Sequence, residues 1–182
     1  MIFDTFSEFY KKNMNLNEET IQAWIDKTLF TYHWWLGVIL IIVPYILWFK
    51  FRKRKSADRL HYAGLFVALA SSTLDYVGTF FGLWKYDYEV IPIVPTYTPF
   101  SFAILPITVM FILQIKPKIN PFLKAFAFAV FSLIALPIVK GIGIYDPVKW
   151  NYFYSFIIQY IMYLIAHYLG TRNRFAELKE QK

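Results

Sequence analysis

Long apolar stretches separated by short polar segments dominate the chain. Five of them are 17 to 23 residues long: 29–49, 60–82, 99–115, 121–139 and 150–169. Because an α-helix rises about 1.5 Å per residue, stretches of about 17–25 apolar residues are long enough to cross a bilayer. The pattern predicts an all-α fold, an integral membrane bundle of five transmembrane helices that occupies residues 29–170.

Prolines mark several helix boundaries in this pattern. Thr98, Asn120 and Asp146 each stand directly before a proline, and a capping side chain followed by proline is typical of a helix start. Three other prolines fall inside predicted spans: Pro44, Pro106 and Pro137. Each removes a helical hydrogen bond, so we expect kinks that open room for a cavity.

Residues 1–28 precede the first span as a separate amphipathic arm. Asn17 can cap a helix in which Ile21, Trp24 and Ile25 recur at helical spacing. We expect an interfacial helix that lies along the extracytoplasmic membrane surface. A helix that docks on a membrane protein partner is the alternative.

Composition supports a membrane location. The chain is 58% hydrophobic and 17% charged, which is too apolar for a soluble domain of 182 residues. The net charge of +7 comes from short tracts beside apolar runs, a pattern of membrane anchoring and not of a nucleic-acid-binding face. The chain has no cysteine, which excludes disulfides and thiolate chemistry.

The distribution of Lys and Arg predicts the orientation. Thirteen of the 19 basic residues lie in 50–59, 116–124 and the tail 171–182, whereas eight of the twelve acids lie in the other connecting segments. Cytoplasmic loops are enriched in Lys and Arg. We therefore expect the N-terminus outside and a cytoplasmic basic tail at 171–182.

Asp75 is an acid within the second predicted span, where a charge is costly and usually faces protein or a wet cavity. Small residues share its helix face and predict close packing against a neighbouring helix: Gly64, Ala68, Ser71, Gly78 and Gly82. Asp75 is either a structural residue that pins this packing or a functional carboxyl that responds to protons, ions or a ligand.

A count of depth along the helices suggests partners for Asp75. Thr108, Ser155 and Gln159 lie at a similar depth, and Lys140 either reaches inward or extends to the membrane surface. These five residues form a candidate intramembrane polar site. We expect a mostly neutral Asp75 that donates a hydrogen bond to Gln159 or Thr108 and that tolerates replacement by Asn.

The segment between the second and third spans contains several prolines and many aromatic residues, so we expect it to lie over the outer mouth of the bundle. Its polar and aromatic side chains, with one from the fifth span, form a candidate outer vestibule: Trp84, Tyr86, Asp87, Glu89 and Trp150. An aromatic belt at the level of the lipid headgroups is the alternative explanation for the tryptophans.

These segments resemble an uncharacterised family of small multi-pass membrane proteins of spore-forming Firmicutes. The resemblance covers spans two to five and rests on Leu74, Asp75, Gly82 to Tyr86, Pro92, Pro95, Phe102, Pro106, Gln114 and Lys149 to Phe156. It implies the bacterial cell membrane and a five-helix bundle, and it implies no activity. Family members tend to carry acids just before the proline of the third span and within the fourth, where this chain has Ser101 to Pro106 and Leu136 to Lys140.

No catalytic or metal-binding signature accompanies this pattern. His33, His61 and His167 lack the spacing of metal ligands, and the chain has no glycine-rich phosphate loop or nucleophile elbow. We therefore predict no catalytic residue, metal or cofactor. The expected function is a non-enzymatic component that binds membrane lipids, a small molecule, a membrane protein partner or a second copy of itself. A small transporter coupled through Asp75 and a lipid-modifying membrane enzyme are the alternatives.

Overall fold

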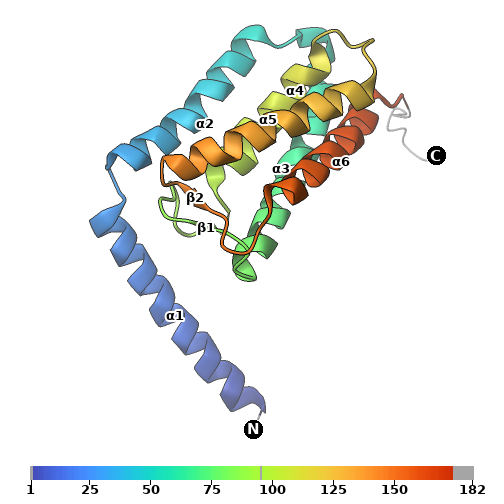
Figure 1. Cartoon of the computed structure of the whole chain (residues 1–182). Helices are drawn as coiled ribbons and strands as arrows, with labels where there is room; N and C mark the ends of the chain where they lie inside the picture. Colours follow the sequence, from blue (N-terminus) through green and yellow to red (C-terminus); the bar gives the residue numbers. More distant parts are fainter. Residues whose placement is uncertain (1, 95, 174–182) are drawn as a thin grey trace, which may run out of the picture.

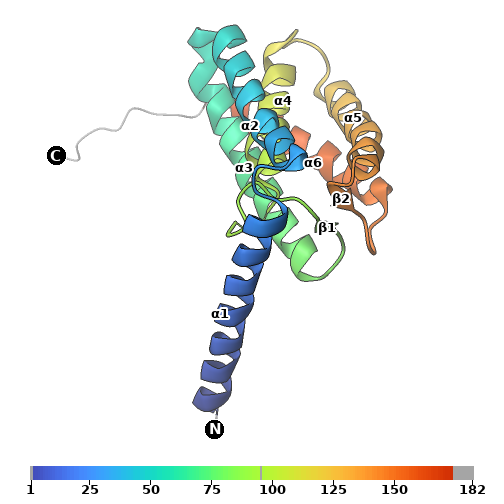
Figure 2. The same ribbon diagram turned by 90° about the vertical axis from the view of Figure 1, so that its left-hand side faces the viewer.

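The computed structural model describes residues 2–94 and 96–173, with side chains from residue 6 onward. In chain order the elements are α1 (Ile2–Lys27), α2 (Tyr32–Phe51), the 3-10 turn η1 (Arg54–Ser56), α3 (Ala57–Phe80), β1 (Lys85–Tyr86), the π-helix η2 (Pro99–Ile104), α4 (Leu105–Gln114), α5 (Pro121–Gly141), β2 (Tyr145–Asp146) and α6 (Tyr152–Thr171). Helices α2 to α6 form a bundle, and α1 projects away from it (Figure 1; Figure 2). Most of the predicted tail 171–182 lies outside the described residues.

Within the described residues, four helical segments are long and apolar enough to cross a membrane: Tyr32–Phe51, Arg54–Phe80, Pro121–Gly141 and Tyr152–Thr171. The helix Pro99–Gln114, made of η2 and α4, is apolar but shorter. It ends where Ile115 becomes extended and Lys116 adopts a positive φ of 42°, directly before Pro117. The all-α prediction is confirmed, with four helices of full spanning length.

Helix α1 is a single helix of 26 residues. It continues through Asn17, so the prediction that Asn17 caps a shorter helix is wrong. Its last turn is bonded to the rest of the protein, because Trp24 Nε1 donates to Glu89 O at 2.7 Å. A position of the arm on the membrane surface stays a prediction.

Two of the helix starts are capped by asparagine. Asn120 Oδ1 accepts from Phe122 N at 2.9 Å, as predicted for the start of α5. The start predicted at Asp146 is wrong, because Asp146 belongs to β2 and α6 begins at Tyr152, where Asn151 Oδ1 accepts from Phe153 N at 2.8 Å. Thr98 precedes η2 without a side-chain capping bond.

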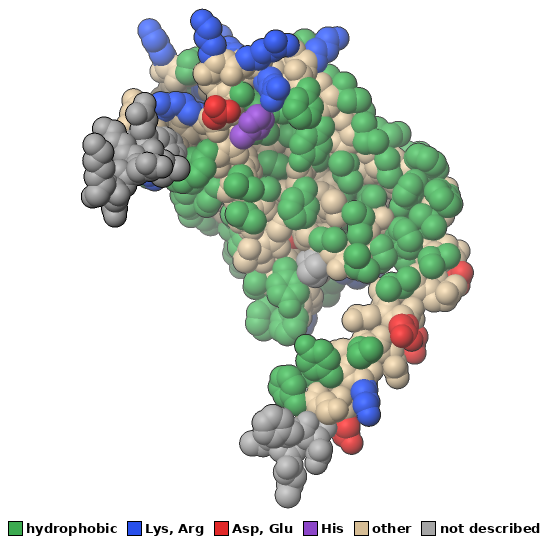
Figure 3. Space-filling view, turned by 180° about the vertical axis from the view of Figure 1, so that it is seen from behind, with side chains coloured by type: hydrophobic (Ala, Val, Ile, Leu, Met, Phe, Trp, Pro, Cys, Tyr) green, Lys and Arg blue, Asp and Glu red, His purple; other side chains and the backbone are tan. Residues whose placement is uncertain are grey.

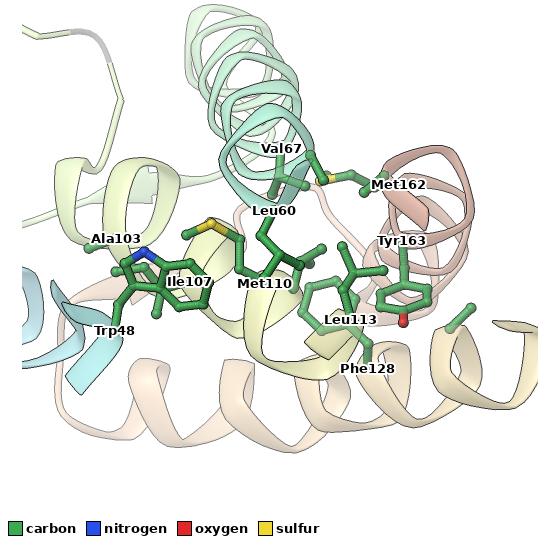
Figure 4. Packing of buried hydrophobic residues seen from close by; sticks show 14 residues of the cluster. Trp48, Leu60, Val67, Ala103, Ile107, Met110, Leu113, Phe128, Met162 and Tyr163 are labelled. Atoms are coloured by element: carbon green, nitrogen blue, oxygen red, sulfur yellow. The ribbon is translucent and has the colours of Figure 1, made fainter. Parts of the chain in front are cut away.

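The packed core lies toward the end of the bundle that carries the α2–α3 and α4–α5 connections, which we call the basic end because Lys50 to Lys55, Lys116 and Lys118 lie there. Trp48 comes from the end of α2, Val67 from α3, and Phe128 and Tyr163 from α5 and α6 (Figure 4). All four are at most 1% exposed. This end is therefore stabilised by dense apolar packing.

The opposite end, which we call the strand end, is closed by two loops that pair with each other. Strands β1 and β2 are antiparallel, with Lys85 opposite Asp146 and Tyr86 opposite Tyr145. Lys149 N also donates to Leu83 O at 2.8 Å. These bonds join the long loop, residues 81–98, to the α5–α6 connection, and so bring together segments about 60 residues apart in the sequence.

The flank of the bundle is apolar. Figure 3 shows hydrophobic side chains over its middle and Lys and Arg side chains gathered at one end. Ile39 of α2, Leu65 of α3 and Ile134 of α5 are each more than half exposed. An exposed apolar surface of this extent suits contact with lipid hydrocarbon and not with water.

Candidate functional site

Asp75 is the centre of a hydrogen-bonded cluster at the strand end of α3. The residue is 6% exposed. Oδ1 accepts from Trp84 Nε1 at 2.9 Å and from the Tyr86 hydroxyl at 2.7 Å. Oδ2 accepts from the Thr96 hydroxyl and from Tyr97 N, both at 2.7 Å, and the Ser101 hydroxyl lies 3.4 Å away. We call these six residues the Asp75 cluster.

These bonds make Asp75 an acceptor. The indole N–H of Trp84 and the backbone N–H of Tyr97 can only donate, and they lie on different oxygens. The prediction that Asp75 donates to Gln159 or Thr108 is therefore wrong. The bonds of Asp75 hold both ends of the long loop against α3 and η2.

Tyr86 keeps its proton in this arrangement. Burial, and then the neighbouring Asp75, raise the pKa of Tyr86 well above its ordinary value. Its ring also stacks on Tyr97, with centroids 4.8 Å apart. The phenol is thus fixed as a hydrogen-bond donor at neutral pH.

Two glycines at the end of α3 position Trp84. A Cβ at Gly78 would overlap the Trp84 indole, so only glycine leaves room for that ring. Gly82 has a φ of +63°, its N–H donates to Thr79 O, and Leu83 N donates to Gly78 O. This pattern is a Schellman motif, which ends the helix and turns the chain back toward Asp75.

The π-helix η2 arises from a proline and from its neighbours. Pro106 has no N–H to donate to Phe102 O or Ser101 O, the carbonyls four and five residues before it. The Tyr45 hydroxyl of α2 donates to Phe102 O at 2.8 Å instead. The Ser71 hydroxyl of α3, which also bonds to Val67 O, lies 3.2 Å from Ser101 O. A side chain of another helix thus satisfies Phe102 O, one of the carbonyls that the proline leaves free, and the Ser71 hydroxyl lies near the other.

A cavity of about 150 Å³, which we call the bundle cavity, lies beside the Asp75 cluster. Its wall is mostly apolar and comes from α3, η2, α4, α5, α6 and both loops of the strand end. Trp84 and Trp150 meet edge to face at this wall, with centroids 4.7 Å apart. A cavity of this size lined by apolar side chains accommodates about one aromatic ring.

The candidate intramembrane polar site is only partly assembled. Asp75, Ser155 and Gln159 all line the bundle cavity. Ser155 Oγ accepts from Trp150 Nε1 at 2.8 Å, and Gln159 Oε1 is buried without a hydrogen-bond partner among the described residues. Thr108 of α4 does not line the cavity, and Lys140 is exposed at the end of α5.

The candidate outer vestibule divides between two cavities. Trp84, Tyr86 and Trp150 line the bundle cavity, whereas Asp87 and Glu89 line a second cavity between α1 and the long loop, which Tyr86 also borders. We call the second one the loop cavity. The predicted residues thus lie near one another but do not form one site.

The small-residue face of α3 packs against protein over most of its length. Gly64, Ser71 and Gly78 are buried, and Ala68 is half-buried. A Cβ at Gly64 would lie 2.7 Å from Met110 Sδ of α4. Gly82 is exposed with open space around it, so its assignment to the packing face is wrong. This glycine instead allows the backbone turn that ends α3.

Sequence reasoning missed three members of the Asp75 cluster: Thr96, Tyr97 and Ser101. The available signal was the run Thr96-Tyr97-Thr98 between two prolines, a polar turn in an otherwise apolar segment. Within the described residues no group of three His, Asp or Glu side chains is placed to hold a metal ion. Comparison of the chain with protein-family models, with curated proteins and with solved structures found no match.

Proposed function

We propose that the protein is a non-enzymatic multi-pass protein of the bacterial cell membrane that binds a lipid or small apolar molecule in the bundle cavity. The bundle cavity is the observation that carries this proposal: it is a mostly apolar space within the helices, and its wall contains a buried acceptor, Gln159 Oε1, that has no partner among the described residues. Apolar pockets with a few placed polar groups are typical ligand sites. Among possible ligands of the bundle cavity, membrane lipids are the class that we propose to test first.

The Asp75 cluster supports binding over ion-coupled transport. The two carboxylate oxygens of Asp75 accept four hydrogen bonds of 2.7–2.9 Å. A coupled ion or proton would therefore have to displace donors that hold the long loop. A lipid-modifying enzyme is supported less well, because three carboxylates that could serve it near the outer mouth do not converge: Asp75 lines the bundle cavity, whereas Asp87 and Glu89 line the loop cavity. We assign Asp75 the structural role of holding the wall of the binding site.

We further propose five spans, with Pro99–Gln114 as a short third one, and an N-terminus outside the cell. Lys and Arg gather at the basic end, which by the positive-inside rule is cytoplasmic. The chain has no native cysteine, so single cysteines report cleanly. Ser56→Cys should react with membrane-impermeant reagents only from the cytoplasm, and Ile93→Cys, at a residue 73% exposed, only from outside. Reaction of both cysteines from one side would refute this topology.

A photoreactive lipid tests occupancy of the bundle cavity. We suggest a phospholipid with a diazirine at the end of one acyl chain, incorporated into vesicles with the full chain. Cross-links should map to Leu136, which lines the cavity, and to Ile134, which is 59% exposed on the flank of the same helix. Filling the cavity by Ala135→Leu should remove the Leu136 cross-link and leave the Ile134 cross-link. Equal loss of both, or retention of both, would contradict the proposal.

A further inference from the structure

The loop cavity, separate from the bundle cavity, has a volume of about 640 Å³. Its walls come from the last turns of α1 and from residues 86–94 of the long loop. The indoles of Trp24 and Trp34 donate to Glu89 O and Val90 O at 2.7 and 3.2 Å, so two tryptophans fix the loop backbone beneath the cavity. The volume is within the range of pockets that hold small ligands.

Opposite charges face this cavity without neutralising each other. Lys27 of α1 and Glu89 of the long loop both line it. The ion pairs among the described residues all involve Lys85, with Asp87 at 2.9 Å and with Asp146 at 3.9 Å. Lys27 and Glu89 are therefore available to a ligand, and they are further apart than a direct ion pair.

The surroundings of Glu89 favour a cation. Its side chain has no hydrogen bond within the described part of the chain, and Tyr86, Tyr88 and Trp24 provide aromatic walls around the same space. Burial, and then Asp75, raise the pKa of Glu89 to about 7. A carboxylate that is costly to ionise gains from a bound ammonium group, and aromatic faces attract such groups as well.

We propose that the loop cavity binds a phosphodiester-linked ammonium group, with the ammonium at Glu89 and the phosphate at Lys27. Two opposite charges that line one cavity without a direct ion pair between them suit a zwitterion, whereas a simple amine would leave Lys27 unused. The same chemistry occurs in the headgroup of phosphatidylethanolamine and in soluble glycerophosphoethanolamine. This site is independent of the function proposed for the bundle cavity.

The proposal predicts a pH dependence with a definite sign. Only ionised Glu89 attracts an ammonium, so affinity should fall as the pH decreases from 8 to 6. The other charged or titratable groups that line the cavity are Lys27, Tyr86, Asp87 and Tyr88, and Asp75 and Tyr97 lie close enough to interact electrostatically with Glu89. His33 of α2 stacks on Tyr88 at 3.9 Å, so His33→Gln serves as the control for its titration.

Binding to the purified full chain should be measured by calorimetry with glycerophosphoethanolamine, and in nanodiscs that contain phosphatidylethanolamine or phosphatidylglycerol. Glu89→Gln should weaken binding of the zwitterion about tenfold or more, because a charge-assisted hydrogen bond is lost. Lys27→Gln should weaken it as well, but should leave the weaker binding of ethanolamine unchanged. Asp146→Asn, which removes a carboxylate outside the cavity at the same end, should have no effect.

Each arm gives a distinct outcome. Binding of the soluble diester and of the nanodisc lipid would assign the site to the shared group, and binding of the lipid alone would assign it to a membrane headgroup. Failure of both ligands to bind would overturn the proposal. Binding that is the same in Glu89→Gln, or that does not change in the wild type between pH 6 and pH 8, would overturn it too.

Discussion

The interior of the bundle differs between its two ends: one is filled with apolar side chains, and the other encloses a cavity. At the basic end, Phe128, Tyr163 and Val67 are 0% exposed and pack against one another and their neighbours (Figure 4). At the strand end, the helices enclose the bundle cavity, and the hydrogen bonds of Asp75 hold the loops that close it. Helix α5 passes through both regions: Ala129 lies in the packed part, and Ala135 lines the cavity.

The two ends differ in how strictly their contacts fix the geometry. Apolar packing has little directional preference, so many side-chain sets of similar volume would hold the basic end together. The hydrogen bonds of a buried acid are directional, and a partner left unsatisfied costs more than the bond itself contributes. Directional bonds therefore fix the geometry of the wall at the strand end, which suits a site that must keep a cavity open.

The largest loss of stability is expected for substitutions of Asp75. Asp75→Leu removes the acceptor of four donors, of which the Thr96 hydroxyl has another in Ser101 Oγ at 2.8 Å, and should lower the free energy of unfolding by about 3 kcal/mol or more. Asp75→Asn should cost about 1–3 kcal/mol. Either orientation of the amide places its NH₂ group against a donor that cannot accept, Trp84 Nε1 on one side or Tyr97 N on the other. The sequence-based expectation that Asn is tolerated is thus replaced by its opposite.

Unfolding of the wild type and of the Asp75 variants in mixed detergent micelles measures their free energies of unfolding. Thr73→Val is the matched control, since Thr73 is exposed on the same helix and bonds only to Leu69 O of its own turn. It should change stability by less than about 0.5 kcal/mol. If Asp75→Asn were as stable as the wild type, the bonds of Trp84 and Tyr97 would not determine the strand end.

The sequence predicts the helices better than the contacts of the long loop at the strand end. Helices of spanning length follow from runs of apolar residues, and the buried face of Gly64, Ser71 and Gly78 follows from their spacing along α3. Both signals are local. The start of α5 was predictable for the same reason, because Asn120 and Pro121 act within one turn.

The partners of Asp75 are not local. Thr96 and Tyr97 reach it across the long loop, which has no periodicity, and depth counting placed Thr108 there instead. The π-helix depends on Tyr45, 57 residues before the carbonyl that it satisfies. Gly82 is the exception, because a glycine at the end of an apolar run is itself a signal for a helix end.

Gly78→Ala should have the second-largest effect. The added Cβ would overlap the Trp84 indole, so the ring must move and its bond to Asp75 is lost. We expect a loss of about 3 kcal/mol, together with a change in tryptophan fluorescence. Gly141→Ala is the control: it lies at the end of α5 with open space around it and should be neutral or slightly stabilising. Equal effects of the two substitutions would show that Gly78 is not a packing site.

The same alanine-to-leucine substitution at two places on α5 compares the packed part of the bundle with the cavity wall directly. Ala129→Leu adds volume where the residue is 0% exposed and should destabilise the protein by about 2 kcal/mol. Ala135→Leu adds the same atoms at the wall of the bundle cavity and should cost less than about 0.5 kcal/mol. Thermal unfolding in detergent compares the two variants. A larger loss for Ala135→Leu would mean that the cavity closes in solution.

A smaller effect is expected for a side-chain hydrogen-bond donor at the basic end, where Trp48 Nε1 also donates to His61 and Lys53 also bonds to Gln114. Lys124 Nζ of α5 donates to Ile112 O and Ile115 O at 2.8 and 2.6 Å, and so joins α5 to the free carbonyls at the end of α4. Lys124→Met should cost about 1 kcal/mol, because water at this end can replace the lost donor. Lys118→Met removes an exposed charge from the same connection and should leave the unfolding midpoint unchanged. A loss for Lys124→Met as large as that for Asp75→Leu would remove the contrast, since both ends would then depend on directional bonds.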